Sequence, residues 1–149
     1  MKYALELKIE VPRQEVIRVF DHTENTFRWQ PGLKDLELIS GNDREHGASY
    51  QLLYKGRKGE LRVEETVLLR NLPDEFVTLQ TSPGVRNTIR HTFSETADHQ
   101  TLWRMENHFR FRGMMRLMAP LMKQAFSGNT LLNMERFKSF AENKFRESE

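Results

Sequence analysis

The feature that most constrains this 149-residue chain is a long, strongly apolar stretch from Gly113 to Phe145. Its second half places apolar residues at the i, i+3, i+4 spacing of one buried helical stripe, and its first half is apolar almost all round. This pattern predicts a long helix that is too apolar to lie on the surface. Pro120 is expected in the first turn of that helix or at a kink. The apolar residues are Met114, Met115, Leu117, Met118, Leu121, Met122, Ala125 and Phe126, followed by Leu131, Met134, Phe137, Ala141 and Phe145.

Most of the chain before this helix alternates between polar and apolar residues, as half-buried strands do. A first strand over residues 3–11 has its odd-numbered residues on the inner face. Pro12 then opens a short helix, and a second helical turn over 22–29 ends at Pro31-Gly32. Six further strands are predicted at 33–40, 49–55, 59–72, 76–81, 86–95 and 101–112. Their short links favour an antiparallel meander, and the long helix covers one face of the sheet.

Composition excludes several kinds of function. A chain with 38% hydrophobic and 30% charged residues is typical of a globular protein, and its length fits a single domain, 1–149. The absence of cysteine excludes disulfides, thiolate metal sites and cysteine nucleophiles. A net charge of +2 is too small to indicate nucleic-acid binding. The N-terminal segment lacks the apolar run of a signal peptide and no stretch is long enough to span a membrane, so a cytoplasmic protein is expected.

Common catalytic and cofactor-binding motifs are also missing. The sequence contains neither of the glycine-rich nucleotide-binding loops, G-x-G-x-x-G and G-x-x-x-x-G-K-(S/T). It also lacks the zinc-protease motif H-E-x-x-H and the serine-hydrolase motif G-x-S-x-G. Its five histidines show no close metal-ligand spacing. We therefore expect no metal and no cofactor.

The order of elements and three local patterns resemble the START-like, or helix-grip, superfamily, which includes the polyketide cyclase/dehydratase-like and Bet v 1-like ligand carriers. The segment Arg28-Trp29-Gln30-Pro31-Gly32-Leu33 is similar to the W-x-P-G segment of such proteins. The spacing of Gly41 and Gly47 before the third strand and the Arg112-Gly113 entry to the last helix are similar as well. The resemblance covers essentially the whole chain. It implies an α+β fold in which a seven-stranded curved antiparallel sheet grips the last helix, with an apolar cavity between them.

The members of this superfamily include lipid and sterol carriers, quinone-binding accessory proteins, co-chaperones, and cyclases or dehydratases, so the fold leaves the function open. Strand alternation directs several polar side chains, Asn87 among them, into one mostly apolar interior, as in a ligand site. We therefore expect a hydrophobic or amphipathic small molecule, such as a lipid, quinone or polyketide-like compound, to bind there. The residues expected to bind it are Trp29, Tyr50, Leu52, Val63, Glu65, His91, Trp103, Met105, Asn107, Phe109, Met118, Met122 and Phe126.

Each of these residues also has an ordinary structural explanation. Tyr50 can belong to the core with its hydroxyl reaching water, an inward histidine is usually a satisfied structural residue, and helix methionines are usually core. A slip or bulge of one residue turns Glu65 to solvent. If Glu65 and His91 instead meet as an acid/base pair, the chain is an enzyme of the cyclase/dehydratase kind, which is the second hypothesis. The carrier hypothesis requires no chemical step.

Two groups of basic residues give a third hypothesis. They are Arg110, Arg112, Arg116 and Lys123, and Lys55, Arg57 and Lys58. A solvated surface is the ordinary explanation, and docking on an anionic membrane or an acidic partner is the alternative. In that case the chain is an interaction module whose cavity is filled by its own side chains. No nucleic-acid partner is expected, and the chain is expected to be a monomer or a weak homodimer.

Overall fold

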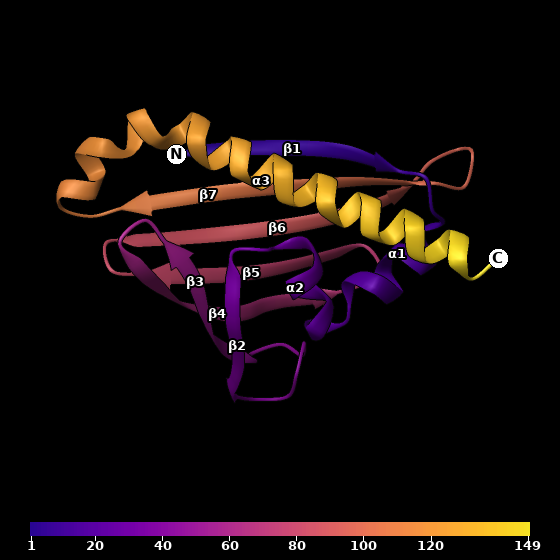
Figure 1. Cartoon of the computed structure of the whole chain (residues 1–149), viewed down its shortest axis with the longest axis horizontal. Helices are drawn as coiled ribbons and strands as arrows, with labels where there is room; N and C mark the ends of the chain where they lie inside the picture. The colour runs from indigo at the N-terminus through magenta and orange to yellow at the C-terminus, as the bar shows by residue number, and fades with distance from the viewer.

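The structure is a computed structural model that describes residues 1–149, and it contains one seven-stranded sheet and a long helix, α3 (Met114–Glu147) (Figure 1). The strand order is β1-β7-β6-β5-β4-β3-β2, and every neighbouring pair is antiparallel. The predicted α+β architecture is therefore confirmed. The strands are β1 (Lys2–Ile9), β2 (Leu33–Ser40), β3 (Ser49–Gly56), β4 (Gly59–Asn71), β5 (Glu75–Ser82), β6 (Val85–Glu95) and β7 (Thr101–Phe111). Between β1 and β2 lie α1 (Arg13–Phe20), the 3-10 turn η1 (Thr23–Asn25) and α2 (Thr26–Trp29).

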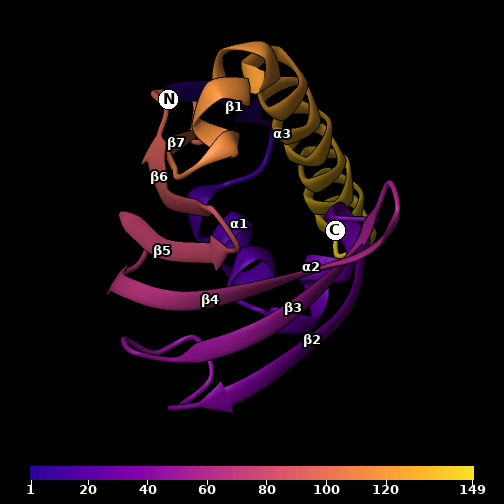
Figure 2. The ribbon, with the colours of Figure 1, turned by 90° about the vertical axis from the view of Figure 1, so that its left-hand side faces the viewer.

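The sheet is strongly curved, and the helices lie on its concave side. Figure 2 shows α3 along one edge of this concave face, above β1 and β7, with α1 and α2 in the hollow below it. The two short helices therefore occupy the space between α3 and the β2–β4 part of the sheet. This arrangement leaves an interior bounded by strands on one side and helices on the other.

Local sequence explains the first elements directly. In β1 the odd-numbered residues are consistently more buried than their neighbours, and Ile9 is completely buried. Pro12 then stands at the N-cap of α1, where its fixed φ and missing N–H cost nothing. The buried face of α1 consists of Val16, Val19 and Phe20, at the spacing of a single helical stripe.

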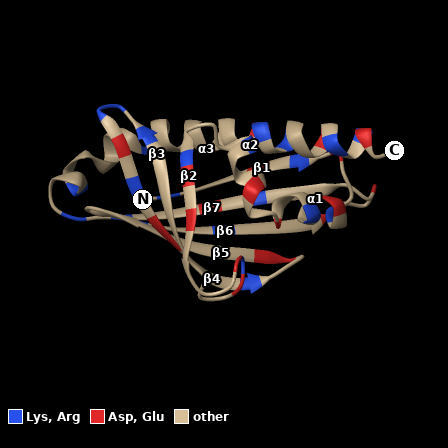
Figure 3. Cartoon of the chain, turned by 60° about the horizontal axis from the view of Figure 1, so that its bottom comes forward, with Lys and Arg blue, Asp and Glu red and all other residues tan.

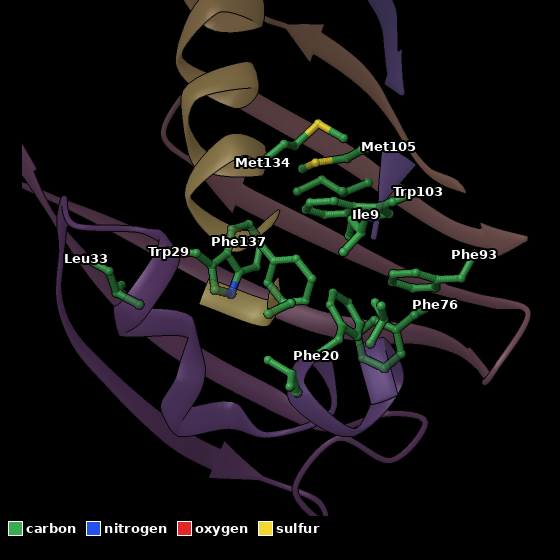
Figure 4. Close-up of a cluster of buried hydrophobic side chains, with 14 of the residues drawn as sticks. Ile9, Phe20, Trp29, Leu33, Phe76, Phe93, Trp103, Met105, Met134 and Phe137 are labelled. Carbon is green, nitrogen blue, oxygen red and sulfur yellow. The ribbon is translucent and has the colours of Figure 1, made fainter. Parts of the chain in front are cut away.

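The main hydrophobic core lies under the second half of α3 (Figure 4). Phe137 and Trp103 are fully buried, with ring centroids 4.9 Å apart. Trp29 packs edge-on against both rings, at 5.5 Å and 5.9 Å. Phe93 stacks on Trp103 from the next strand. These aromatic contacts join α2, α3 and the sheet into one core.

The first half of α3 differs from the prediction, because it is largely exposed rather than buried. Met114, Leu117 and Leu121 are 79%, 80% and 84% exposed. Figure 1 shows that α3 begins beyond the end of β7, and that its first turns lie at an angle to the rest. Pro120 lies inside the helix, which is the kinked alternative rather than a helix start. A helix segment beyond the sheet edge can bury only one of its sides, whatever its composition.

A bulge in β4 also changes one expected orientation. The pairing between β4 and β5 shifts register between Val67 and Leu69. Val67 is buried, whereas Leu68 and Leu69 are both more than a third exposed. The strict alternation that places Leu69 on the inner face therefore stops at Val67, while Glu65 keeps its inward register.

Charged residues are spread over the outer surface, and lysine and arginine occur along most of the molecule. In Figure 3 one group of them lies at the turn between β3 and β4 and another at the start of α3, at the same end of the sheet. No helix is both long enough and apolar enough to cross a membrane.

Candidate ligand-binding site

A cavity of about 490 Å³ lies between the inner face of the sheet and α3. Six strands contribute to its lining, and α2 and α3 complete it. Its apolar walls are Trp29, Leu61, Val63, Pro83, Val85, Ile89, Met105, Phe109, Met115 and Phe126. Its polar lining residues are Tyr3, Gln30, Tyr54, Gln80, Ser82, Asn87, Asn107, Asn129, Thr130 and Asn133. The cavity is partly open to solvent and most of its lining surface is apolar, which is the usual form of a small-molecule site.

The polar lining consists entirely of amides and hydroxyls. No aspartate, glutamate, lysine, arginine or histidine lines the cavity. Three of the hydroxyls are held in place by neighbours: Tyr54 donates to Oε1 of Gln30 at 2.8 Å, and the hydroxyls of Tyr3 and Thr130 lie 2.8 Å apart. Burial raises the pKa of both tyrosines, so they are neutral donors.

Two asparagines form the most buried polar part of the cavity wall. Asn87 on β6 and Asn107 on β7 are 5% and 3% exposed. Nδ2 of Asn87 donates to Oδ1 of Asn107 at 2.9 Å. Oδ1 of Asn87 and Nδ2 of Asn107 have no hydrogen-bond partner. Buried polar atoms are normally paired, so this part of the cavity wall holds one unmet acceptor and one unmet donor, both almost completely covered by neighbouring atoms.

Glu65 stands next to this wall without lining it. The register places Glu65 opposite Gln80, and Gln80 opposite Asn87, on three neighbouring strands. Nε2 of Gln80 donates to Oε2 of Glu65 at 2.6 Å. Burial raises the pKa of Glu65, although the bond from Gln80 and the charge of Arg44 act in the opposite direction. Glu65 therefore holds the side chain of Gln80, which itself faces the cavity.

His91 lies in the aromatic core and not in the cavity wall. Its Nδ1 accepts a hydrogen bond from Nε1 of Trp103 at 3.2 Å, and its ring stacks against Phe93 and Trp103. Burial, together with the charge of Arg44, lowers the pKa of His91 to about 3. His91 and Glu65 do not meet. Glu65 pairs with Gln80, and on β6 the partner of Gln80 is Asn87, whereas His91 pairs with Phe76. The imidazole is thus a neutral structural acceptor.

The other expected ligand contacts divide between the cavity and the surrounding structure. Trp29, Val63, Met105, Asn107, Phe109 and Phe126 line the cavity, whereas Tyr50, Leu52, Glu65, His91, Trp103, Met118 and Met122 do not. Tyr50 donates to Asp43 at 2.5 Å and accepts from the amide of Arg44 at 2.6 Å, so its hydroxyl serves the loop before β3. Leu52 and Trp103 belong to the core. Met118 is 49% exposed on the projecting half of α3.

Several lining residues were missed from the sequence although a signal existed for some of them. Alternation along β5 places Thr78, Gln80 and Ser82 on the inner face of the sheet. This pattern was sufficient to predict the two lining residues of β5, Gln80 and Ser82. Asn129, Thr130 and Asn133 follow Phe126 on one side of α3. Their polar side chains give no sign of facing inward, because a polar helix face normally faces solvent.

Neither a family model nor a curated protein sequence matches this chain. Solved structures do match it over nearly its whole length. A START superfamily protein from Mycobacterium smegmatis has a TM-score of 0.78 at 11% identity, covering 95% of this chain and 97% of its own. The Zhui aromatase/cyclase from Streptomyces sp. R1128 has a TM-score of 0.76 at 12% identity, covering 97% and 95%. Ara h 8.0201 has a TM-score of 0.75 at 12% identity, covering 95% and 97%.

These likenesses concern the fold, because identities of 11–12% are too low to carry an activity across. Proteins with this fold commonly bind hydrophobic ligands. The curved sheet, the two short helices and the long final helix of this chain are the same elements in the same order. The chain therefore has the helix-grip fold of the START-like and Bet v 1-like proteins.

Proposed function

We propose that this protein binds and carries a hydrophobic or amphipathic small molecule in the cavity between the sheet and α3. The observation that carries the proposal is the cavity itself, about 490 Å³ in volume, with a mostly apolar lining surface and ten polar lining residues that are all uncharged. Its size is within the range of small-molecule sites. The interaction-module hypothesis requires a cavity filled by the protein's own side chains, which is the opposite arrangement.

Enzymatic proton transfer has less support from the geometry. His91 lies next to the lining residues Ile89 and Met105 but does not line the cavity, and it already accepts a hydrogen bond from Trp103. Glu65 is the stronger candidate, because its raised pKa suits an acid and its partner Gln80 lines the cavity. The likeness to an aromatase/cyclase keeps this second hypothesis open for test. If Glu65→Gln and His91→Ala both retain full turnover of a substrate found by extraction, proton transfer by these two residues is excluded.

The first test of carriage is native mass spectrometry of freshly purified protein, followed by solvent extraction of whatever is released. We expect one apolar molecule per chain. A parallel assay uses the uncharged fluorescent probe N-phenyl-1-naphthylamine, which is expected to bind at a single site. Ile89→Trp adds a large ring to the cavity wall and should abolish probe binding, whereas Leu132→Trp on the exposed side of α3 should not. An empty spectrum together with no probe binding by the wild-type protein would reject the proposal.

A further inference from the structure

The unpaired amide atoms of the cavity wall indicate which hydrogen-bonding groups a ligand would need. Asn87 and Asn107 use one hydrogen bond on each other and leave an oxygen and an NH2 group without partners. If both amides are turned round, the pair still offers one oxygen and one NH2 group. Leaving such groups buried and unpaired is costly, so a wall that keeps both is suited to a ligand that satisfies both.

The cavity also lacks any charged side chain that could neutralise an ion. Six amides line it, from Gln30, Gln80, Asn87, Asn107, Asn129 and Asn133, with no lysine, arginine or histidine among the lining residues. A carboxylate or phosphate held against the buried part of this lining would lose much of its hydration and gain no countercharge from the lining residues. The carboxyl group of Glu65 behind Gln80 makes an anion less favourable still, since any ionised fraction would repel it.

We infer that the cavity selects an uncharged apolar molecule that carries a hydrogen-bond donor and an acceptor close together. A small rotation of the two amides turns their unpaired atoms to the cavity, so that the donor meets Oδ1 of Asn87 and the acceptor meets Nδ2 of Asn107. The hydrocarbon part lies against the aromatic and aliphatic walls. Carboxamides and hydroxyl-bearing carbonyl compounds have this chemistry, whereas carboxylates and phosphates do not. This inference rests on the proposed carrier function and narrows its ligand class.

Three probes that share a naphthalene ring test separately for the need of a donor and for the exclusion of a negative charge. 2-Naphthamide offers a donor and an acceptor, 2-acetonaphthone offers an acceptor alone, and 2-naphthoate is an anion at pH 8. By isothermal titration calorimetry we expect the amide to bind about 10-fold more tightly than the ketone. We expect the anion to bind about 100-fold more weakly than the amide. Equal affinity of the amide and the anion would overturn the inference.

The double variant Asn87→Leu/Asn107→Leu identifies the atoms responsible. It should remove the preference for the amide over the ketone and still bind N-phenyl-1-naphthylamine. Because both members of the pair are replaced together, no buried polar atom is left unpaired and the fold should keep its stability. Asn143→Leu, at an exposed asparagine of α3 that does not line the cavity, is the control and should keep the preference.

The outcomes distinguish this inference from the carrier function. Probe binding without discrimination among the three naphthyl compounds rejects the inference and leaves carriage intact. No binding of any probe rejects both. A double variant that folds and keeps the wild-type preference would reject the inference. It would show that ordered water satisfies the two asparagines and that they do not determine which ligand binds.

Discussion

Two inward polar residues of the sheet, His91 and Glu65, show how position along a strand determines the role of a side chain. His91 stands among aromatic rings, where its only polar contact is Nε1–H of Trp103. Glu65 stands beside Gln80 and thereby influences the polar wall of the cavity. Burial shifts the pKa of both side chains, but in opposite directions: the pKa of His91 is lowered and that of Glu65 is raised.

The lowered pKa of His91 makes stability depend on pH. In the folded state His91 titrates with a pKa of about 3, whereas an unfolded histidine titrates near about 6.5. Between these values the unfolded chain binds the extra proton, so stability is fully present above about pH 6.5 and is lost as the pH falls. The slope from this one group approaches about 1.4 kcal/mol per pH unit.

Urea unfolding of the wild type and His91→Gln between pH 4.5 and 8 tests this prediction. The glutamine oxygen can still accept the bond from Trp103, and the variant should lose less stability at acidic pH than the wild type. Glu65 contributes the opposite sign, stability lost as the pH rises, but it is present in both proteins and cancels in the difference. Exposed His46→Gln is the control. An unchanged slope in His91→Gln would contradict the assignment.

At the scale of the element, the two halves of the long helix α3 differ in what they bury. The second half buries Met134, Phe137 and Ala141 against the core. The first half contributes Met115 and Phe126 to the cavity and leaves Met114, Leu117 and Leu121 in solvent. The first half is the more apolar of the two by sequence and yet the more exposed, so composition alone does not decide burial.

Alanine substitutions should reveal this difference in stability. Phe137→Ala removes a fully buried ring and should lower the free energy of unfolding by about 3–5 kcal/mol. Leu121→Ala, on the same helix, removes a side chain that is 84% exposed and should change it by less than about 0.5 kcal/mol. Chemical denaturation measures both. A large loss for Leu121→Ala would mean that the first half of α3 is covered in solution.

Membrane contact stays a prediction, and the exposed half of α3 is the place to test it. From Asn107 to Met134 the chain has no aspartate or glutamate, and Arg110, Arg112, Arg116 and Lys123 are all exposed. Vesicles containing phosphatidylglycerol should bind the protein better than phosphatidylcholine vesicles. Neutralising two of these charges, as in Arg116→Gln/Lys123→Gln, should weaken binding roughly 30-fold at low salt.

Apolar variants provide the matched comparison for the same vesicles. Leu117→Ser/Leu121→Ser should reduce sedimentation with phosphatidylglycerol vesicles, because these two side chains are the most exposed apolar groups of the segment. Leu38→Ser/Ile39→Ser removes exposed apolar groups from β2 and should have little effect. If the two double variants behave alike, α3 has no special part in any membrane contact.

At the scale of the whole molecule, α3 passes over both an aromatic core and a cavity, and beside the cavity it still contacts β7 through Phe109 and Phe126 and β1 through Tyr3 and Thr130. The aromatic core lies at one end, between Trp103 and Phe137, and the cavity lies at the other, bounded by Phe109 and Phe126. A ligand that fills the cavity would supply the contacts missing there. Ligand binding and global stability are therefore coupled.

This coupling predicts a shift in the unfolding midpoint. A ligand present at 100 times its dissociation constant should add about 2.7 kcal/mol to the free energy of unfolding. N-phenyl-1-naphthylamine is a suitable ligand, and urea unfolding with and without it gives the measurement. Ile89→Trp should show no such gain. A stabilised wild type and an equally stabilised Ile89→Trp would place the probe outside the cavity.

Local patterns of the sequence were enough to predict the element order, the antiparallel sheet, the inward face of β1, the helix that Pro12 opens and the buried stripe of α3. These features follow from residue spacing and from the fixed geometry of proline, which act over a few neighbours. Only the tertiary structure decided which side chains surround a cavity and which fill the core. His91 and Asn87 have the same strand parity on β6, yet one lies among rings and the other faces the cavity. That difference depends on which elements cover each level of the sheet, since Phe20 of α1 packs against His91, and no local pattern records such a contact. The exposed half of α3 has the same cause, since burial of a helix requires a surface to cover it.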